Sequence, residues 1–162
     1  LSWLKTPSDQ MRLTHLLNNL LDGNIEKFEK DLSGFLQTVA SVHDYATQPE
    51  AFYHGFMLAL TSSILDTYYV ESNRESGYGR PDMLLIPKDK NKTQAIILEF
   101  KHVYKNETLE AVAKAALDQI QLNQYATNIK QYDYIDAVIT VGLAFDGKKA
   151  HCQFKAIPQA EI

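Results

Sequence analysis

Near residue 68 the hydrophobic period of the chain changes from the 3.6-residue repeat of helices to the two-residue repeat of strands. Helical repeats cover residues 11–21, 25–36 and 49 to about 68. Strands are predicted over residues 68–72, 81–86, 95–101, 135–145 and 149–157, with one long helix at 107–129. The chain is therefore predicted to run helix, three strands, helix, two strands after its first helical pair.

Turn and cap residues support these boundaries. Ser8 and Asp9 supply a cap signal for the first helix, and Asp22-Gly23 closes it. The Asp146-Gly147 pair predicts a hairpin between the last two strands. The first helix should bury one apolar stripe, made of Met11, Leu13, Leu16, Leu17, Leu20 and Leu21.

The connections between these elements predict the fold class. A helix between the third and fourth strands implies that those strands are parallel, whereas the short turns elsewhere imply antiparallel neighbours. We therefore expect an α/β (mixed α+β) fold, a mixed central sheet flanked by helices. With 162 residues, one globular unit is expected, with a helical extension (1–48) packed on a core formed by 49–162.

Composition excludes several classes of protein. Twenty acidic residues against 16 Lys and Arg give a net charge of −4, which is not the overall footprint of an avid nucleic-acid binder. No apolar stretch approaches the roughly 20 residues that span a bilayer. Cys152 is the only cysteine, which excludes an internal disulfide and suits a reducing compartment, so a cytoplasmic location is expected. Because the chain begins at Leu1 without a leader, it is expected to be a piece of a longer protein.

Charged residues interrupt the two central apolar strands. Glu99 and Lys101 are two residues apart, so they stand on one face of a strand, roughly 6–7 Å apart. Asp82, at the start of the preceding strand, comes beside Glu99 if the two strands pair as a hairpin. Two neighbouring carboxylates repel unless a cation or proton separates them, and Mg²⁺ is a natural partner for such a pair. A lysine beside that ion could act on water and on a phosphate.

These residues resemble the signature of the PD-(D/E)XK nuclease superfamily: Pro81-Asp82 on one strand, then Glu99-Phe100-Lys101 on the next. The longer stretches "FYHGFMLAL", "SNRESGYGRPDMLLIP", "AIILEFK", "ALDQIQLNQY" and "VGLAFDGKK" are similar to the module of this superfamily found C-terminal to AAA-ATPase-like regions. The resemblance runs from about residue 50 to 154. It implies a restriction-endonuclease-like αβββαβ core.

The resemblance also implies an activity. Asp82 and Glu99 would ligate Mg²⁺ or Mn²⁺, and Lys101 would belong to the catalytic centre. The reaction expected is hydrolysis of a nucleic-acid phosphodiester bond, with DNA preferred to RNA as substrate. An AAA-ATPase-like region of the full-length protein is the partner that the resemblance suggests, and no membrane is implied.

Other candidate site residues come from the flanking elements. Glu50 and His54 lie four apart at the start of the third helix, where the superfamily often supplies a further acid; Glu71 and Glu75 are rivals for that role. Downstream, the candidates are Gln119, Gln121 and Tyr125. On one continuous helix Gln119 and Tyr125 would be about 120° apart, whereas Gln121 and Tyr125 would share a face.

Three loop residues are candidates for contacts with nucleic acid. Arg80, next to Asp82, is of the type that binds a phosphate with a forked guanidinium. Tyr78 and Tyr104 are expected in loops near the site, where an aromatic ring can stack on a base.

Two alternatives to a nuclease stay open on sequence alone. The domain could be a binding or regulatory module with little catalysis, which the negative net charge allows. It could also be an assembly domain in which the helical hairpin of residues 11–36 forms a dimer face.

Overall fold

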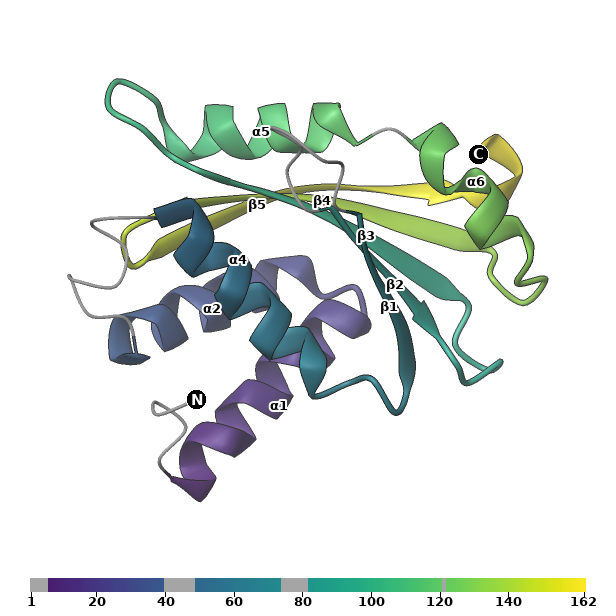
Figure 1. The fold of residues 1–162 in the computed structure, drawn as a ribbon, viewed down its shortest axis with the longest axis horizontal. Coiled ribbons are helices and arrows are strands. Elements are labelled where there is room, and N and C mark those ends of the chain that lie inside the picture. The colour runs from purple at the N-terminus through teal and green to yellow at the C-terminus, as the bar shows by residue number, and fades with distance from the viewer. Residues whose placement is uncertain (1–5, 40–48, 74–81, 121) are drawn as a thin grey trace.

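The computed structural model describes residues 6–39, 49–73, 82–120 and 122–162, and it has a five-stranded mixed sheet between two layers of helices (Figure 1). Its order along the sheet is β1-β2-β3-β4-β5, with β3 and β4 parallel and the other neighbours antiparallel. The strands are β1 (Tyr68–Asn73), β2 (Asp82–Pro87), β3 (Gln94–His102), β4 (Ala137–Asp146) and β5 (Lys149–Pro158). The helices are α1 (Pro7–Leu21), α2 (Ile25–Val39), α4 (Pro49–Ser62), α5 (Leu109–Gln119) and α6 (Leu122–Lys130), with a short 3₁₀ turn at Gln159–Glu161. The predicted mixed α/β fold and its strand directions are confirmed.

Helices α1 and α2 form the predicted hairpin, with a different cap. Thr6 is the N-cap of α1, and it exchanges hydrogen bonds with Asp9 in a capping box, so the helix begins at Pro7. Gly23 has φ of 77°, a conformation that glycine adopts without strain, and it ends the first helix as predicted. Met11 does not belong to the buried stripe: its side chain is 74% exposed, because the helix turns this position towards solvent.

Helix α4 is shorter than predicted and ends at Ser62, six residues before β1 begins. At its C-terminus the hydroxyl groups of Thr61, Ser62 and Ser63 donate to carbonyl oxygens three or four residues earlier. Such side-chain bonds compete with the backbone ladder of a helix. The residues that follow therefore continue in non-helical turns instead of extending the helix to residue 68.

The long helix predicted over residues 107–129 is wrong, because the structure has two helices there. Ile120 is extended, with φ of −65° and ψ of 113°, and its N–H donates to the carbonyl oxygen of Leu117 to cap α5. The two helices cover overlapping but different parts of the sheet: α5 packs on β3, β4 and β5, and α6 contributes to a cluster with β2, β3 and β4. Since the strands of a sheet twist relative to one another, one straight helix could not follow both surfaces.

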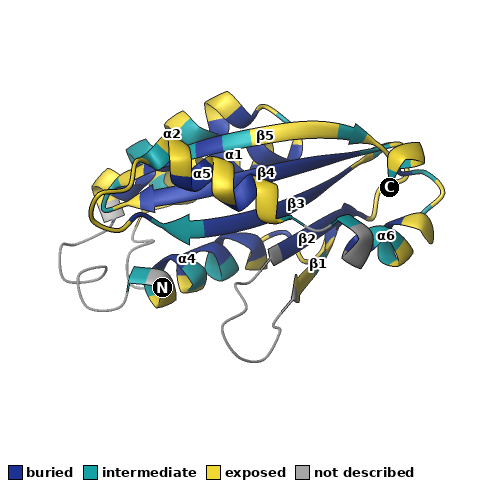
Figure 2. Ribbon diagram, turned by 90° about the horizontal axis from the view of Figure 1, so that it is seen from above, coloured by how far each residue is buried: buried dark blue, intermediate teal, exposed yellow. Residues whose placement is uncertain are grey.

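The central strands are buried on both faces (Figure 2). One face packs on α1, α2 and α4 in a single cluster that includes Phe28, Met57 and Leu98, and the other face packs on α5 and α6 (Figure 1). The boundary predicted after residue 48 adjoins a segment outside the described residues and stays a prediction. None of the described helices has the length and apolar character needed to cross a bilayer.

Candidate active site

The candidate site is built on the C-terminal end of β3. Glu99 and Lys101 occupy the same strand face as Ala95 and Ile97, which belong to the cluster under α6. The intervening Leu98 and Phe100 are buried on the opposite face, as the sequence predicts. Glu99 is only 4% exposed, whereas Lys101 is half-buried. An acidic and a basic residue are thus held on the α5/α6 side of a strand that is packed on both faces.

The hairpin of β2 and β3 fixes the position of Asp82 relative to Glu99. The two strands pair antiparallel with Met83 opposite Leu98 and Leu84 opposite Ile97. Continued by one position, this register places Asp82, the first residue of β2, across from Glu99. The Cα atoms of directly opposite residues in an antiparallel pair of strands are about 4.5–5.5 Å apart. The backbone arrangement predicted for the two acidic residues is therefore present; the Asp82 side chain lies outside what is described.

Helix α5 is held very close to this part of the sheet by a glycine. Gly142 of β4 is the register partner of Glu99. A Cβ atom added there would overlap the carbonyl oxygen of Ala113 and the backbone nitrogen of Leu117, and would lie 2.8 Å from the Leu117 Cα atom. Only glycine permits this approach. The backbone of α5 therefore lies directly on β4 at Gly142, next to Glu99 on β3.

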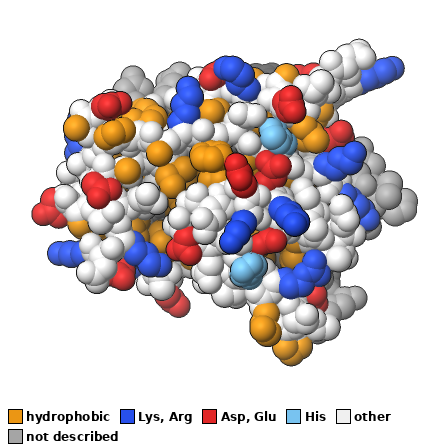
Figure 3. All heavy atoms as spheres, turned by 180° about the vertical axis from the view of Figure 1, so that it is seen from behind, with side chains coloured by type: hydrophobic (Ala, Val, Ile, Leu, Met, Phe, Trp, Pro, Cys, Tyr) orange, Lys and Arg blue, Asp and Glu red, His pale blue; other side chains and the backbone are white. Residues whose placement is uncertain are grey.

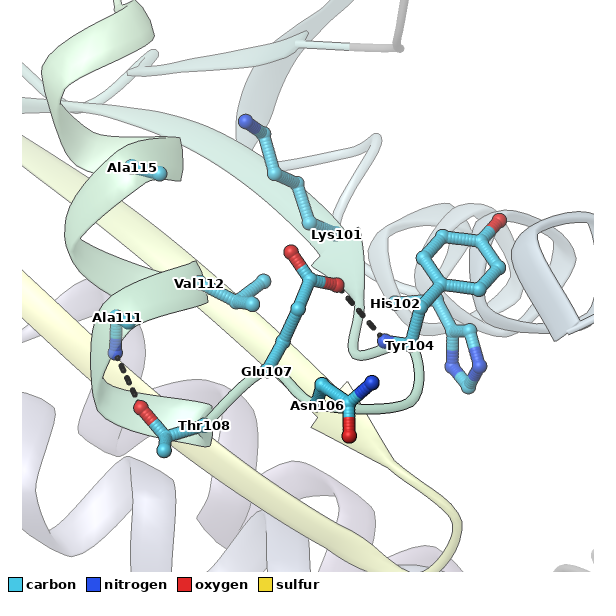
Figure 4. Close-up of a pocket in the computed structure, with 9 residues that line it drawn as sticks. All are labelled: Lys101, His102, Tyr104, Asn106, Glu107, Thr108, Ala111, Val112 and Ala115. Atoms are coloured by element: carbon cyan, nitrogen blue, oxygen red, sulfur yellow. Dashed lines mark hydrogen bonds between the residues drawn. The ribbon is translucent and has the colours of Figure 1, made fainter.

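A pocket of about 340 Å³ opens between the end of β3 and the N-terminal half of α5 (Figure 4). Lys101 and His102 line it on the strand side, and Ala111, Val112 and Ala115 line it on the helix side. Residues 103–108 connect the two walls and supply Tyr104, Asn106, Glu107 and Thr108.

The connecting loop is fixed by hydrogen bonds. The Val103 N–H donates to the carbonyl oxygen of Phe145 on β4 (2.8 Å), and the Tyr104 N–H donates to a carboxylate oxygen of Glu107 (2.9 Å). Asn106 has φ of 69°, a left-handed conformation that Asn tolerates better than most residues. Thr108 accepts from the Ala111 N–H and caps α5. The shape of the pocket is thus set by the backbone.

The candidates for a further acid lie in different places. Glu50 is in the first turn of α4, a helix that packs on the sheet face opposite Glu99, and its side chain is not described. His54 of the same helix has its ring 6.1 Å from that of Phe100. The Glu71 carboxylate accepts a hydrogen bond from the Asn128 side chain of α6 (2.8 Å). Glu75 lies outside the described residues. The role of each stays a prediction.

The break at Ile120 changes the geometry expected for the downstream candidates. Gln119 is the exposed last residue of α5, whereas Tyr125 is on α6 and is only 3% exposed, packed in the cluster with Leu84 and Ile97. The rotation of about 120° expected for one continuous helix does not apply across two helices. Gln121, between them, lies outside the described residues, as do Arg80 and Tyr78.

The charged groups of the described residues do not by themselves identify a cation-binding site. Among the described side chains, which do not include that of Asp82, no group of three or more His, Cys, Asp or Glu residues is arranged to hold a metal ion. Within the same ranges, the ion pairs are His15–Asp31, Lys114–Asp118 and His151–Glu29, so none involves Glu99. On the face shown in Figure 3, acidic and basic side chains are interspersed rather than gathered by sign.

Sequence reasoning missed two features that shape the site. Gly142 carries no turn signal, since it stands inside an apolar strand; an isolated glycine in a strand is the only hint of a close backbone approach. The pocket combines residues from β3 and α5 that are up to 14 positions apart, Lys101 and Ala115. Neither feature has a periodic sequence pattern.

A model of a known protein family matches the chain. The model described as the PD-(D/E)XK nuclease superfamily matches residues 48–155, two thirds of the chain. No curated protein matches the chain. The matched range contains the β2–β3 hairpin, both helices of the α5/α6 side and most of the sheet.

Proposed function

Because the chain belongs to the PD-(D/E)XK nuclease superfamily, we propose that it is a metal-dependent nuclease that hydrolyses nucleic-acid phosphodiester bonds. The observation that carries this proposal is the end of β3. There a buried Glu99 and a half-buried Lys101 share one face of the strand. Asp82 precedes Met83, the first residue of β2 that pairs with β3, and the same register places it across from Glu99.

Asp82 and Glu99 are proposed to hold the cation, Mg²⁺ or Mn²⁺. The fit rests on Glu99: an ionised carboxylate that is 4% exposed is costly to bury unless a cation or strong donors compensate it. Two carboxylates with water suit hard divalent cations, which prefer oxygen ligands. Such a cation, when bound, supplies positive charge to the phosphate and makes a nearby water more acidic.

Lys101 is proposed to orient and activate the attacking water. Lys101 lines the pocket at the end of β3, a strand whose preceding residues are packed on both faces. The water oxygen bonds to phosphorus as the phosphorus–oxygen bond on the opposite side breaks; the proton that the water loses passes to solvent, and the leaving oxygen takes up one proton from solvent. The ammonium form of the lysine offsets negative charge that develops on the phosphate oxygens.

The remaining candidates are proposed as supporting residues. Glu50 would supply an additional acid, Gln119 or Gln121 with Tyr125 would support the site from the α5/α6 side, and Arg80 would contact the backbone of the substrate. DNA is the favoured substrate over RNA, a cytoplasmic location is proposed, and an AAA-ATPase-like region of the same protein is the proposed partner.

The proposal is tested by cleavage of labelled single- and double-stranded DNA and RNA with Mg²⁺, Mn²⁺ or EDTA. Cleavage should require a divalent cation, and Asp82→Asn, Glu99→Gln and Lys101→Ala should each lower its rate about 100-fold or more, as loss of a charge-stabilising or acid–base group does. Glu110→Gln and Lys149→Ala, matched changes at exposed positions of α5 and β5, should cleave at the parent rate.

A calorimetric titration with Mn²⁺ separates the nuclease from a binding module. Binding should be present in the parent chain and weakened in Asp82→Asn and Glu99→Gln. Absence of cleavage on every polymer, together with Mn²⁺ binding that survives both substitutions, would refute the proposed site and favour a nuclease-fold module that binds without cutting.

A further inference from the structure

The Glu107 carboxylate lines the pocket beside Lys101 and has no part in the hydrolysis proposed above. Two hydrogen bonds hold this residue in a tight turn. Its N–H donates to the carbonyl oxygen of Tyr104 (3.1 Å), and its Oε1 atom accepts from the Tyr104 N–H (2.9 Å). Among the described residues no donor bonds to the second oxygen, Oε2. Figure 4 shows this oxygen between the Lys101 side chain and Val112 of α5, so it faces the pocket.

The Tyr104 ring does not occupy this space. It meets the His102 ring edge to face, with centroids 4.9 Å apart, and His102 is nearly parallel to Tyr53 of α4 at 5.9 Å. Tyr53 is stacked on Phe145 of β4 at 4.3 Å, which continues this column of rings into the core. Because the column runs towards α4, the Tyr104 ring is turned away from α5.

The wall across from Glu107 is apolar (Figure 4). Ala111, Val112 and Ala115 of α5 contribute it. The pocket volume of about 340 Å³ falls within the range of about 300–1,000 Å³ in which small-molecule sites are found. An ionised carboxylate only accepts hydrogen bonds, and it repels a phosphate, which is negative and also an acceptor. A ligand for this space therefore needs a carbon–hydrogen surface for the helix and a hydrogen-bond donor for Glu107.

A sugar meets both requirements, because a furanose has carbon–hydrogen faces and carries hydroxyl groups at its edge. In a nucleic acid the sugar is bonded directly to the phosphate, whereas the base is further away. Lys101, which is proposed to act at the phosphate, lines the same pocket as Glu107. The group that reaches Glu107 from a phosphate at Lys101 is therefore the adjoining sugar.

We propose that Glu107 recognises a hydroxyl group of the sugar next to the cleaved phosphate, through a hydrogen bond from that hydroxyl to Oε2. The inference rests on the proposed function for the position of the phosphate. Two sources supply such a hydroxyl: the 2′-hydroxyl of a ribonucleotide, and the 3′-hydroxyl at the end of a DNA or RNA strand. An internal deoxyribonucleotide has neither, so Glu107 gives the site a preference for RNA or for strand ends.

Binding measured without cleavage tests this contact independently of catalysis. Fluorescence anisotropy in EDTA and in Ca²⁺ uses the full chain and two pairs of labelled single strands. The first pair is one DNA sequence with a 3′-hydroxyl or a 2′,3′-dideoxy end, and the second is RNA and DNA of one sequence, both with 3′-deoxy ends. In the parent chain, loss of the recognised hydroxyl should weaken binding about 10- to 100-fold, because a hydrogen bond to a charged group is lost. In Glu107→Ala the same loss should change affinity by less than about twofold, since the two changes remove one contact.

Glu107→Gln guards against a change in the loop. Its side-chain oxygen can still accept from the Tyr104 N–H, which leaves the –NH₂ group, a donor, facing the pocket. This variant should therefore lose the preference for the hydroxyl as Glu107→Ala does. The control is Glu110→Gln, which removes the same charge from the exposed first turn of α5 outside the pocket lining and should keep the preference of the parent chain.

The two pairs of strands identify the source of the hydroxyl. A Glu107-dependent preference within the first pair assigns the terminal 3′-hydroxyl, and one within the second pair assigns the 2′-hydroxyl. Absence of any preference in the parent chain, or a preference that survives in both Glu107 variants, would overturn the inference, even if cleavage is intact. Conversely, a chain that cleaves nothing yet prefers the hydroxyl through Glu107 would support the contact and contradict the nuclease proposal alone.

Discussion

Replacement of Gly142 by alanine tests the close packing of α5 on the sheet. The added Cβ would overlap backbone atoms of Ala113 and Leu117 and lie 2.8 Å from the Leu117 Cα atom, whereas carbon atoms in favourable contact are about 3.5–4.0 Å apart. Overpacking in a core costs about 1–3 kcal/mol when side chains can give way. Every atom met here belongs to the helix backbone, so we expect the upper end of that range, about 3 kcal/mol in the free energy of unfolding.

Thermal unfolding followed by circular dichroism measures this cost. For a chain of this size about 1 kcal/mol corresponds to about 2–4 °C in Tm, so Gly142→Ala should lower Tm by about 6–12 °C. The control is Gly34→Ala in α2, where a Cβ meets nothing within 4 Å and alanine is the better helix former by about 0.5–1 kcal/mol; its Tm should rise by about 1–4 °C. A Gly142→Ala chain as stable as the parent would refute the close approach of α5.

Two further predictions concern buried polar groups. Tyr53→Phe removes the hydroxyl that donates to the carbonyl oxygen of Gly147, and should cost about 1 kcal/mol, seen as a fall of about 2–4 °C in Tm; an unchanged Tm would contradict the bond. Burial and the Glu29 carboxylate raise the pKa of the Cys152 thiol, so a disulfide reagent at pH 8 should label the native chain about tenfold or more slower than the chain in urea. Equal labelling rates in the two states would contradict the burial of the thiol. Because only the unfolded thiol ionises near its ordinary pKa of about 8.5, the contribution of Cys152 to the free energy of unfolding is complete below that pH and is lost as pH rises above it.

Part of the geometry of the candidate site can be predicted from the local sequence pattern. The two-residue period of a strand is enough to place Glu99 and Lys101 on one face and Leu98 and Phe100 on the other, because alternation is a property of the backbone. The position of Asp82 beside Glu99 follows from the antiparallel pairing of the two strands, in which Met83 stands opposite Leu98.

Other parts of the site could not be predicted in the same way. The break at Ile120 has no glycine or proline to signal it, and it divides Gln119 from Tyr125 in a way that helical periodicity alone cannot anticipate. Met11 continues the apolar repeat of α1 yet is exposed, because its burial depends on what surrounds the start of the helix.

Apart from the break between α5 and α6, the sequence by itself determined the order and type of the elements, the direction of each strand and the charged face of β3, since these follow from local periodicity, turn residues and short connections. The tertiary structure alone decided that α5 lies against Gly142, that a pocket opens beside Lys101, and that Tyr104 ends a ring column rooted in Phe145. These features depend on contacts between residues far apart in the chain, which form only when the twisted sheet brings β3, β4, α4 and α5 together.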